Sequence, residues 1–196
     1  MADRRRRNAN LDVFCALLAR ELPSRPVETG VDIGCGEGET ARILHAYGAG
    51  AVVGVDAHPL SIDQARRIGG DGITYVQADA LDVELSPADV VTSVAMLHHV
   101  DMVEGLRAMA SLVVPGGLLL VVGLAKSRYP RDFLYDVAGS VAVRFYRPWH
   151  TTAPIVWPPP VTYAEARRIA KDVLPGVRYR REITFRYTLA WRRPLV

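Results

Sequence analysis

Apolar runs alternate with amphipathic segments along the first 125 residues. The runs lie at 28–33, 51–56, 73–79, 88–97 and 115–125. They are apolar throughout rather than at every second position, which is typical of strands that are covered on both faces of a sheet. Between and before them, segments with helical spacing lie at 10–21, 37–48, 59–70 and 102–113, the first with Asn10 as its candidate N-cap. This alternation predicts a doubly wound α/β fold with a mostly parallel sheet.

The pattern changes after residue 125. Residues 131–147 predict an amphipathic helix with Leu134, Val137, Val141 and Phe145 on one side. An irregular stretch rich in Pro and Trp follows, and a helix begins again at a capping box, Thr162 with Glu165.

Two final runs, at 177–182 and 184–193, are close enough to form an antiparallel hairpin. The chain of 196 residues is therefore expected to form a single domain, residues 1–196, around a seven-stranded sheet whose last strand is antiparallel.

Composition narrows the class of protein. With 49% apolar residues the chain is globular, and no apolar run approaches the roughly 20 residues of a membrane span. The basic N-terminus is not followed by a long apolar stretch, so it does not predict a secretory signal. Cys15 and Cys35 indicate neither a disulfide framework nor a metal site, and we expect a cytoplasmic protein without a metal.

The net charge of +3 is unevenly distributed. Residues 1–125 carry 10 Arg and 16 acidic residues, a net −6, whereas residues 126–196 carry 14 basic and 5 acidic residues, a net +9. The basic part of the chain could attract an anionic substrate, a nucleic acid or an acidic lipid surface. It could equally be a solvated surface in a chain that uses Arg far more often than Lys.

A glycine-rich turn, Gly34-Cys35-Gly36-Glu37-Gly38, follows the first predicted strand. A dinucleotide-binding fingerprint would require glycine at position 39, which is Glu39 here. Two carboxylates at the start of the helix occupy the place where a pyrophosphate would bind. The turn therefore argues against NAD and favours a ligand that carries positive charge and no phosphate, such as S-adenosylmethionine.

The segment at 31–38, VDIGCGEG, resembles motif I of the class I S-adenosylmethionine-dependent methyltransferases. Segments at 52–66, 76–80, 88–100 and 113–122 are similar to the later motifs of this family, in the same order. The Leu-His-His sequence after strand four resembles the small stand-alone type. The resemblance covers roughly residues 10–125 and 162–192, and it implies a Rossmann-like methyltransferase fold that uses S-adenosyl-L-methionine and releases S-adenosyl-L-homocysteine.

The resemblance also implies which residues contact the cofactor. They are Asp32, Gly34, Cys35, Gly36, Gly38, Asp56, Ala57, Asp79, Ala80 and Ser93. Asp32 would orient the turn and reach the amino end of the cofactor, Asp56 would bind both ribose hydroxyls, and Asp79 would bind the adenine amino group. Each acid also has an alternative structural role. Asp32 could satisfy the N–H groups of the turn itself, Asp56 could be the N-cap of the next helix, and Asp79 could simply form a turn.

His98 and His99 are the candidate general bases, because they follow strand four and an ordinary histidine titrates near about 6.5. Alternatively, they shape the loop through hydrogen bonds. The Asn/Asp-Pro-Pro-Tyr/Phe turn of base-amino methyltransferases and the cysteine of cytosine-carbon enzymes are both missing at this place.

Residues 126–161 are expected to form a lid or substrate insertion, with Leu134, Val137 and Val141 facing inward. The segment holds seven of the 15 aromatic residues. Tyr129, Trp149 and Trp157 are the candidates for acceptor binding, although the segment could instead pack a small core of its own. We expect a methyltransferase for a small-molecule acceptor, and a nucleic acid is the less favoured partner. The alternatives are an RNA-binding or RNA-modifying methyltransferase and a non-catalytic cofactor-binding protein.

Overall fold

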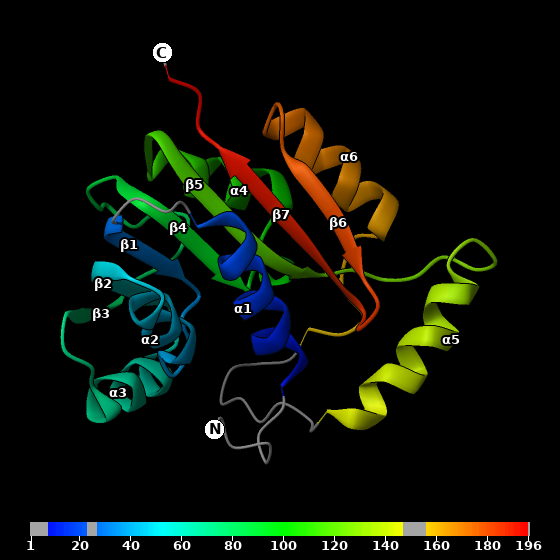
Figure 1. Ribbon diagram of the computed structural model, residues 1–196, viewed down its shortest axis with the longest axis horizontal. Coiled ribbons are helices and arrows are strands. Elements are labelled where there is room, and N and C mark those ends of the chain that lie inside the picture. The colour runs from blue at the N-terminus through cyan, green and yellow to red at the C-terminus, as the bar shows by residue number, and fades with distance from the viewer. Residues whose placement is uncertain (1–7, 23–26, 147–155, 196) are drawn as a thin grey trace.

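The computed structural model describes residues 8–22, 27–146 and 156–195 and contains one seven-stranded sheet (Figure 1). The strands are β1 (Val27–Ile33), β2 (Ala49–Asp56), β3 (Ile73–Gln77), β4 (Ala88–Val94), β5 (Val113–Leu124), β6 (Arg178–Glu182) and β7 (Arg186–Arg192). Their order is β3-β2-β1-β4-β5-β7-β6, and β1 to β5 pair in parallel. β7 is antiparallel to both β5 and β6, which confirms the predicted fold class.

Helices cover both faces of the sheet. They are α1 (Ala9–Glu21), α2 (Glu39–Ala46), α3 (Pro59–Ile68), α4 (Met102–Ser111), α5 (Phe133–Ala142) and α6 (Tyr163–Val173), with short 3-10 turns η2 (Leu97–His99) and η3 (Val143–Phe145). Buried residues of α1, α2 and α3 form one core cluster with the sheet, and those of α4 and α6 form another on the opposite face (Figure 1). The strands are therefore apolar on both sides, as their sequences predict.

Local signals decide where two helices begin. The Thr162–Glu165 capping box is present at the start of α6, as predicted. The expectation for α1 is wrong by one half-turn, because Asn8 and not Asn10 caps this helix. Asn10 is buried in the first turn, where its Oδ1 accepts a hydrogen bond from Nε of Arg186 at 2.6 Å. The side chain thus joins α1 to β7.

Helix α5 lies at the side of the β6–β7 hairpin, away from the helices that cover the sheet (Figure 1). Leu134, Val137 and Val141 were predicted to face inward, but they are 80%, 49% and 57% exposed. The buried position of this helix is Gly139, against Ile183 and Phe185 of the hairpin turn. The inward prediction is wrong because a small residue, rather than the apolar stripe, makes the close contact.

No helix within the described ranges is long and apolar enough to cross a membrane. Cys15 and Cys35 are both free thiols.

Candidate functional site

The glycine-rich turn needs the conformational freedom of glycine. Gly34, Gly36 and Gly38 have φ values of +75°, +53° and +80°, in the left-handed region that side chains disfavour. A Cβ at Gly34 would lie 2.3 Å from the Met96 side chain, and one at Gly38 would lie 2.5 Å from the Tyr75 hydroxyl. A Cβ at Gly36 would meet nothing within 4 Å. Two glycines thus allow close packing, whereas Gly36 presents bare backbone to open space. We call this open space, at the carboxyl ends of β1, β2 and β4, the cleft.

Hydrogen bonds tie this turn to the end of β2. The N–H groups of Gly34 and Cys35 both donate to the Val55 carbonyl, at 2.8 and 2.9 Å. The N–H of Gly36 donates to Oδ2 of Asp56 at 2.8 Å, and Oδ1 of the same carboxylate accepts from the N–H of His58, also at 2.8 Å. Asp56 therefore joins the turn to the start of α3, and each oxygen keeps a lone pair for a ligand.

Asp32 lies beneath the turn and is fully buried. Its oxygens accept hydrogen bonds from the hydroxyls of Thr40 in α2 and Thr92 in β4, the latter at 2.7 Å. Burial raises the pKa of Asp32 to about 6, although both hydroxyls oppose the shift. In this geometry the side chain fixes β1 against α2 and β4, so it positions the turn from below.

The third acid lies at the neighbouring strand end. β2 and β3 are in register from Val52 with Ile73 to Asp56 with Gln77, so the turn after β3 lies next to Asp56. Oδ1 of Asp79 accepts from the N–H of Leu81 at 2.9 Å, which is the turn-forming arrangement. Ala57 and Asp79 are exposed and Ala80 is half-buried. The side of the cleft at the ends of β2 and β3 thus carries two small residues, Ala57 and Ala80, and two carboxylates, Asp56 and Asp79.

The end of β4 forms the opposite side. Ser93 is fully buried, and its Oγ has no hydrogen-bond partner among the described residues. Ala95 has a φ of +55°, a strained value for a residue with a Cβ, and the chain then turns directly into η2. This turn brings Met96 under Gly34 and places His98 and His99 beside the cleft.

The rings of the two histidines are in contact, with centroids 4.1 Å apart and planes tilted by 43°. His98 is buried, and its Nδ1 has no partner in the part of the chain that the structure describes. Burial, and secondarily the neighbouring His99, lowers the pKa of His98 to about 4. Burial also lowers the pKa of the exposed His99, against the attraction of Asp56. His98 is therefore neutral at physiological pH and a weaker base than an ordinary histidine.

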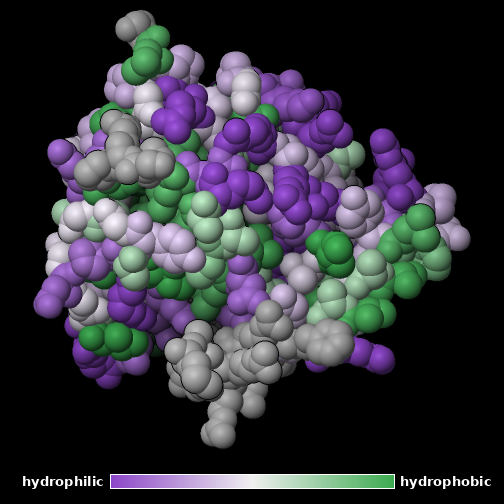
Figure 2. Space-filling view, in the orientation of Figure 1, coloured by the Kyte–Doolittle hydropathy of each residue, from purple (hydrophilic) through white to green (hydrophobic). Residues whose placement is uncertain are grey.

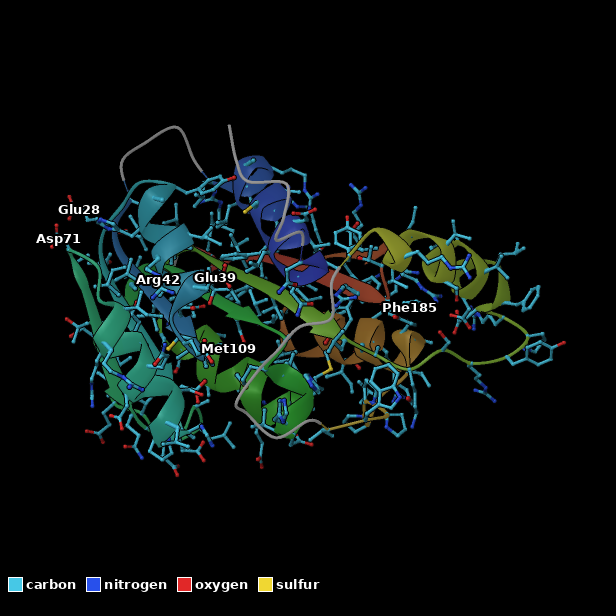
Figure 3. The ribbon with its side chains drawn as sticks, turned by 90° about the horizontal axis from the view of Figure 1, so that it is seen from below. Glu28, Glu39, Arg42, Asp71, Met109 and Phe185 are labelled. Atoms are coloured by element: carbon cyan, nitrogen blue, oxygen red, sulfur yellow. The ribbon has the colours of Figure 1, made fainter. Side chains whose placement is uncertain are left out.

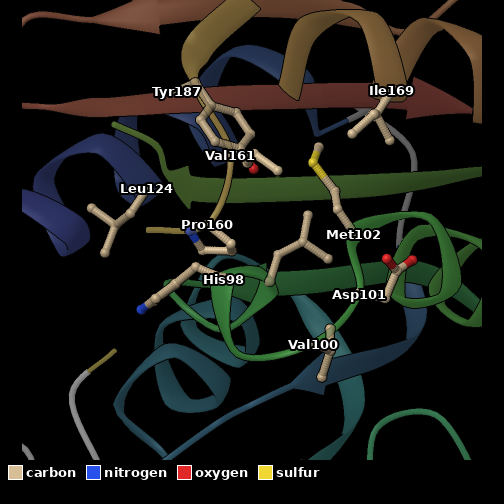
Figure 4. Close-up of a pocket in the computed structure, with 10 residues that line it drawn as sticks. His98, Val100, Asp101, Met102, Leu124, Pro160, Val161, Ile169 and Tyr187 are labelled. Carbon is tan, nitrogen blue, oxygen red and sulfur yellow. The ribbon is translucent and has the colours of Figure 1, made fainter. Parts of the chain in front are cut away.

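A cavity of about 120 Å³ lies next to His98. Its lining comes from η2, the start of α4, the end of β5, α6 and β7 (Figure 4). The lining residues are Leu97, His98, Val100, Asp101, Met102, Leu124, Pro160, Val161, Ile169 and Tyr187. Most of them are apolar, so His98 contributes one of the few polar groups.

Of the residues predicted to bind the acceptor, those that the structure describes are not found in the lining of this cavity. Tyr129 and Trp157 are 81% and 70% exposed and do not line this cavity, and Trp149 lies outside the described residues. Pro160 and Val161 are the members of the 126–161 segment that do line it. Within the described ranges, no group of three His, Cys, Asp or Glu side chains could hold a metal.

Sequence reasoning missed the side chains that support the turn. The Tyr75 hydroxyl donates to the Gly38 carbonyl at 3.4 Å and accepts from Arg42 at 3.2 Å. Thr92 pairs with Asp32 in the register between β1 and β4, which only the strand order reveals. Thr40, the second residue of α2, was the only local signal for a partner of Asp32.

A family model described as a methyltransferase domain matches residues 31–121, the part that builds the cleft. An uncharacterized methyltransferase of Mycobacterium tuberculosis is 35% identical over 196 residues, which cover 96% of this chain and 98% of the relative. The chain belongs to the class I S-adenosylmethionine-dependent methyltransferases. It is thus a transferase with a Rossmann-like fold, as the sequence predicts.

Two further proteins bear on this methyltransferase. The N-methyltransferase NodS of Bradyrhizobium japonicum, in complex with S-adenosyl-L-homocysteine, superimposes with a TM-score of 0.61. The alignment covers 94% of this chain and 87% of NodS at 17% identity, so it shows the fold alone. A ubiquinone biosynthesis O-methyltransferase of Marinobacter nauticus is 33% identical over 119 residues, which is 56% of this chain and 49% of that enzyme.

Proposed function

We propose that this methyltransferase binds S-adenosyl-L-methionine in the cleft at the glycine-rich turn and methylates a small, largely apolar molecule held in the cavity beside His98. The observation that carries this proposal is the position of His98. The residue follows β4, whose carboxyl end borders the cleft, and its buried ring lines an apolar cavity of about 120 Å³. One side chain therefore adjoins both the expected cofactor site and a space for an acceptor.

The residues around the cleft fit this cofactor. Open space at Gly36 lets a ligand contact bare backbone, and the segment from Gly34 to Glu39 carries two carboxylates and no basic residue. Such a site favours the ammonium and sulfonium groups over a pyrophosphate. The remaining lone pairs of Asp56 would accept from the ribose hydroxyls, with Ala57 and Ala80 leaving room for the adenine ring. When bound, the cofactor supplies a methyl group activated by the sulfonium.

The cavity limits the size of the acceptor. A cavity of about 150 Å³ holds one benzene ring in another protein, and the volume here is about 120 Å³. It is therefore suited at most to a single small ring or a short chain, and a nucleotide is too large to be enclosed by it. The ubiquinone biosynthesis O-methyltransferase among the relatives supports a small acceptor of this kind.

His98 would hold the acceptor and receive its proton. A neutral imidazole has one unprotonated ring nitrogen, which would accept a hydrogen bond from a hydroxyl or an amine that enters the cavity. The acceptor atom would form its bond to the methyl carbon while the carbon–sulfur bond breaks and the neutral thioether leaves, and it would thereby become far more acidic. An imidazole with a pKa of about 4 can take the proton at that stage and pass it to His99 and water.

The segment 126–161 completes this proposal as part of the acceptor site. Pro160 and Val161 close the cavity on the side of α6, while the candidates Tyr129, Trp149 and Trp157 remain as contacts for the outer part of a longer acceptor. Closure of this side would exclude water from the transfer. We further propose a cytoplasmic enzyme, supported by the two free thiols.

Calorimetric titration of the full chain with S-adenosyl-L-homocysteine and with NAD tests the cofactor site. We expect S-adenosyl-L-homocysteine to bind and NAD not to bind. Asp56→Ala should weaken binding by about 1.5–3 kcal/mol, because charge-assisted hydrogen bonds to the ribose are lost. The matched change Glu37→Ala, in the same turn, should have little effect. Binding of NAD alone, or equal losses in both variants, would contradict the assignment.

Transfer of labelled methyl groups to single-ring phenols and amines tests the acceptor site. We expect turnover of a ring-sized acceptor and its loss in Ile169→Trp, which fills the cavity without touching the cleft. Cofactor affinity should be unchanged in this variant. Full turnover in Ile169→Trp would show that the acceptor binds elsewhere.

A further inference from the structure

Helix α5 is attached to the rest of the molecule by one face only. Asp132 and Asp136 both pair with Arg181 of β6, and the Arg181 guanidinium also stacks on the Tyr135 ring at 4.1 Å. A Cβ at Gly139 would lie 2.7 Å from the Ile183 carbonyl, so the helix backbone is in close contact with the hairpin turn. Figure 3 shows Phe185 of this turn beside the helix.

The opposite face of α5 is apolar and exposed. Phe133, Leu134, Val137 and Val141 lie at positions that share one side of a helix, and they are 53%, 80%, 49% and 57% exposed. Figure 2 shows this apolar surface along the helix at the edge of the molecule. We call these four residues the α5 stripe. A stripe of this kind marks an interaction site.

Exposed arginines flank the α5 stripe in the sequence. Arg128 and Arg131 precede the helix, Arg144 follows it, and all three are exposed. The only acidic residues between positions 126 and 146 are Asp132 and Asp136, which face Arg181 on the attached side. The segment therefore carries exposed cations at both ends of the apolar helix, and both of its acids are paired with Arg181.

We propose that the α5 stripe docks on an anionic lipid surface. Interfacial helices bury an apolar face about 5–10 Å deep, and flanking basic residues attract acidic headgroups. α5 has ten residues, about 15 Å in length, so it can lie on a bilayer but not cross it. Its position at the periphery of the molecule leaves it accessible to a flat surface (Figure 1).

A second copy of this chain fits the surface less well. A two-fold symmetric interface built on the α5 stripe places the same surface patch of each copy against the other. Arg128, Arg131 and Arg144 of one copy would then lie near this set of arginines in the other copy, without an exposed acid in the segment to compensate them. The arrangement of charge thus selects an anionic occupant. This inference is independent of the proposed acceptor, and its measurement needs no turnover.

Flotation of the full chain with vesicles tests the inference. We expect binding to vesicles of phosphatidylcholine and phosphatidylglycerol in equal parts and little binding to phosphatidylcholine alone. Leu134→Glu should lower the partition coefficient at least about tenfold, because a charge enters the stripe. Changing Arg128, Arg131 and Arg144 together to Gln should lower it roughly 100-fold, since each contributes about fivefold near an anionic surface.

Matched controls change similar residues elsewhere. Ile68→Glu replaces an apolar side chain that is 51% exposed at the end of α3, and Arg167→Gln with Arg168→Gln removes two exposed charges of α6. Both should bind vesicles like the unaltered chain, and melting curves should show every variant folded. The inference is overturned if the unaltered chain does not float, or if Leu134→Glu floats equally well. It is also overturned if sedimentation shows a dimer that Leu134→Glu dissociates. Binding of RNA through the three arginines, without binding to vesicles, would overturn it as well.

Discussion

Replacing Asp32 with Asn is expected to remove a pH-dependent contribution to stability. The carboxyl group is fully buried, and burial raises its pKa from 3.8 to about 6 in the folded protein. Between these values the folded chain binds more protons than the unfolded chain at this site. The stabilising contribution of the protonated group is thus present below pH 3.8 and is lost as the pH rises through about 6.

The magnitude follows from the shift. Roughly two pKa units at about 1.36 kcal/mol each give about 3 kcal/mol. Because Asn does not titrate, the stability of Asp32→Asn relative to the unaltered protein should increase by about this amount from pH about 4 to pH about 7.5. Urea unfolding at several pH values measures the difference directly, with both proteins followed by circular dichroism.

Thr92→Val provides an independent measure at the same site. The Thr92 hydroxyl donates to Oδ1 of Asp32 at 2.7 Å and favours the ionised carboxylate. Its removal should raise the pKa of Asp32 further and shift the pH dependence upward, with the carboxyl group still in place. A difference between Asp32→Asn and the unaltered protein that stays constant with pH would refute the assigned pKa and the desolvation argument behind it.

Three other changes are expected to have specific effects. The unaltered protein should lose stability as the pH falls from about 6.5 towards 4, because a buried neutral histidine opposes protonation. This loss should be smaller in His98→Gln, and thermal melting at several pH values measures the difference. Gly36→Ala should cost about 1 kcal/mol through its φ of +53°, and calorimetry should show a larger loss in cofactor affinity. Arg181→Met should speed hydrogen exchange in α5 while exchange in α2 stays slow.

The sheet and the cleft could be predicted because their signals are local or repeated. Apolar strands and intervening helices fix a parallel sheet, and the carboxyl ends of its strands then meet at one edge. Gly34, Gly36 and Gly38 stand out because glycine is unfavourable without a need for positive φ. The Thr162 capping box is likewise confined to four neighbouring residues.

The state of the buried acid and the histidines could not be predicted. Asp32 has one hydrogen-bond partner eight residues away and another 60 residues away, and only the register of β1 with β4 brings the second into place. The low pKa of His98 arises from burial, which depends on how η2 packs beside β5, α6 and β7. Sequence gives the residue type here but not its environment.

The orientation of α5 shows why periodicity alone can mislead. The spacing of Leu134, Val137 and Val141 correctly predicts a helix with one apolar side. Which side packs inward was decided by Gly139 and by the pairing of Asp132 with Arg181, 49 residues further along the chain. An apolar stripe is a reliable sign of burial only if the rest of the chain offers a surface to cover it.

The cofactor is easier to infer than the acceptor because the two sites draw on different parts of the chain. The matched methyltransferase domain ends at residue 121 and contains the turn, Asp56 and both histidines. Half of the cavity wall comes from later residues, namely Leu124, Pro160, Val161, Ile169 and Tyr187. Relatives that share only the first part can therefore share the cofactor and differ in acceptor. Because α5 and its stripe also belong to this later part, the acceptor and the proposed docking surface can change together while the cleft stays the same.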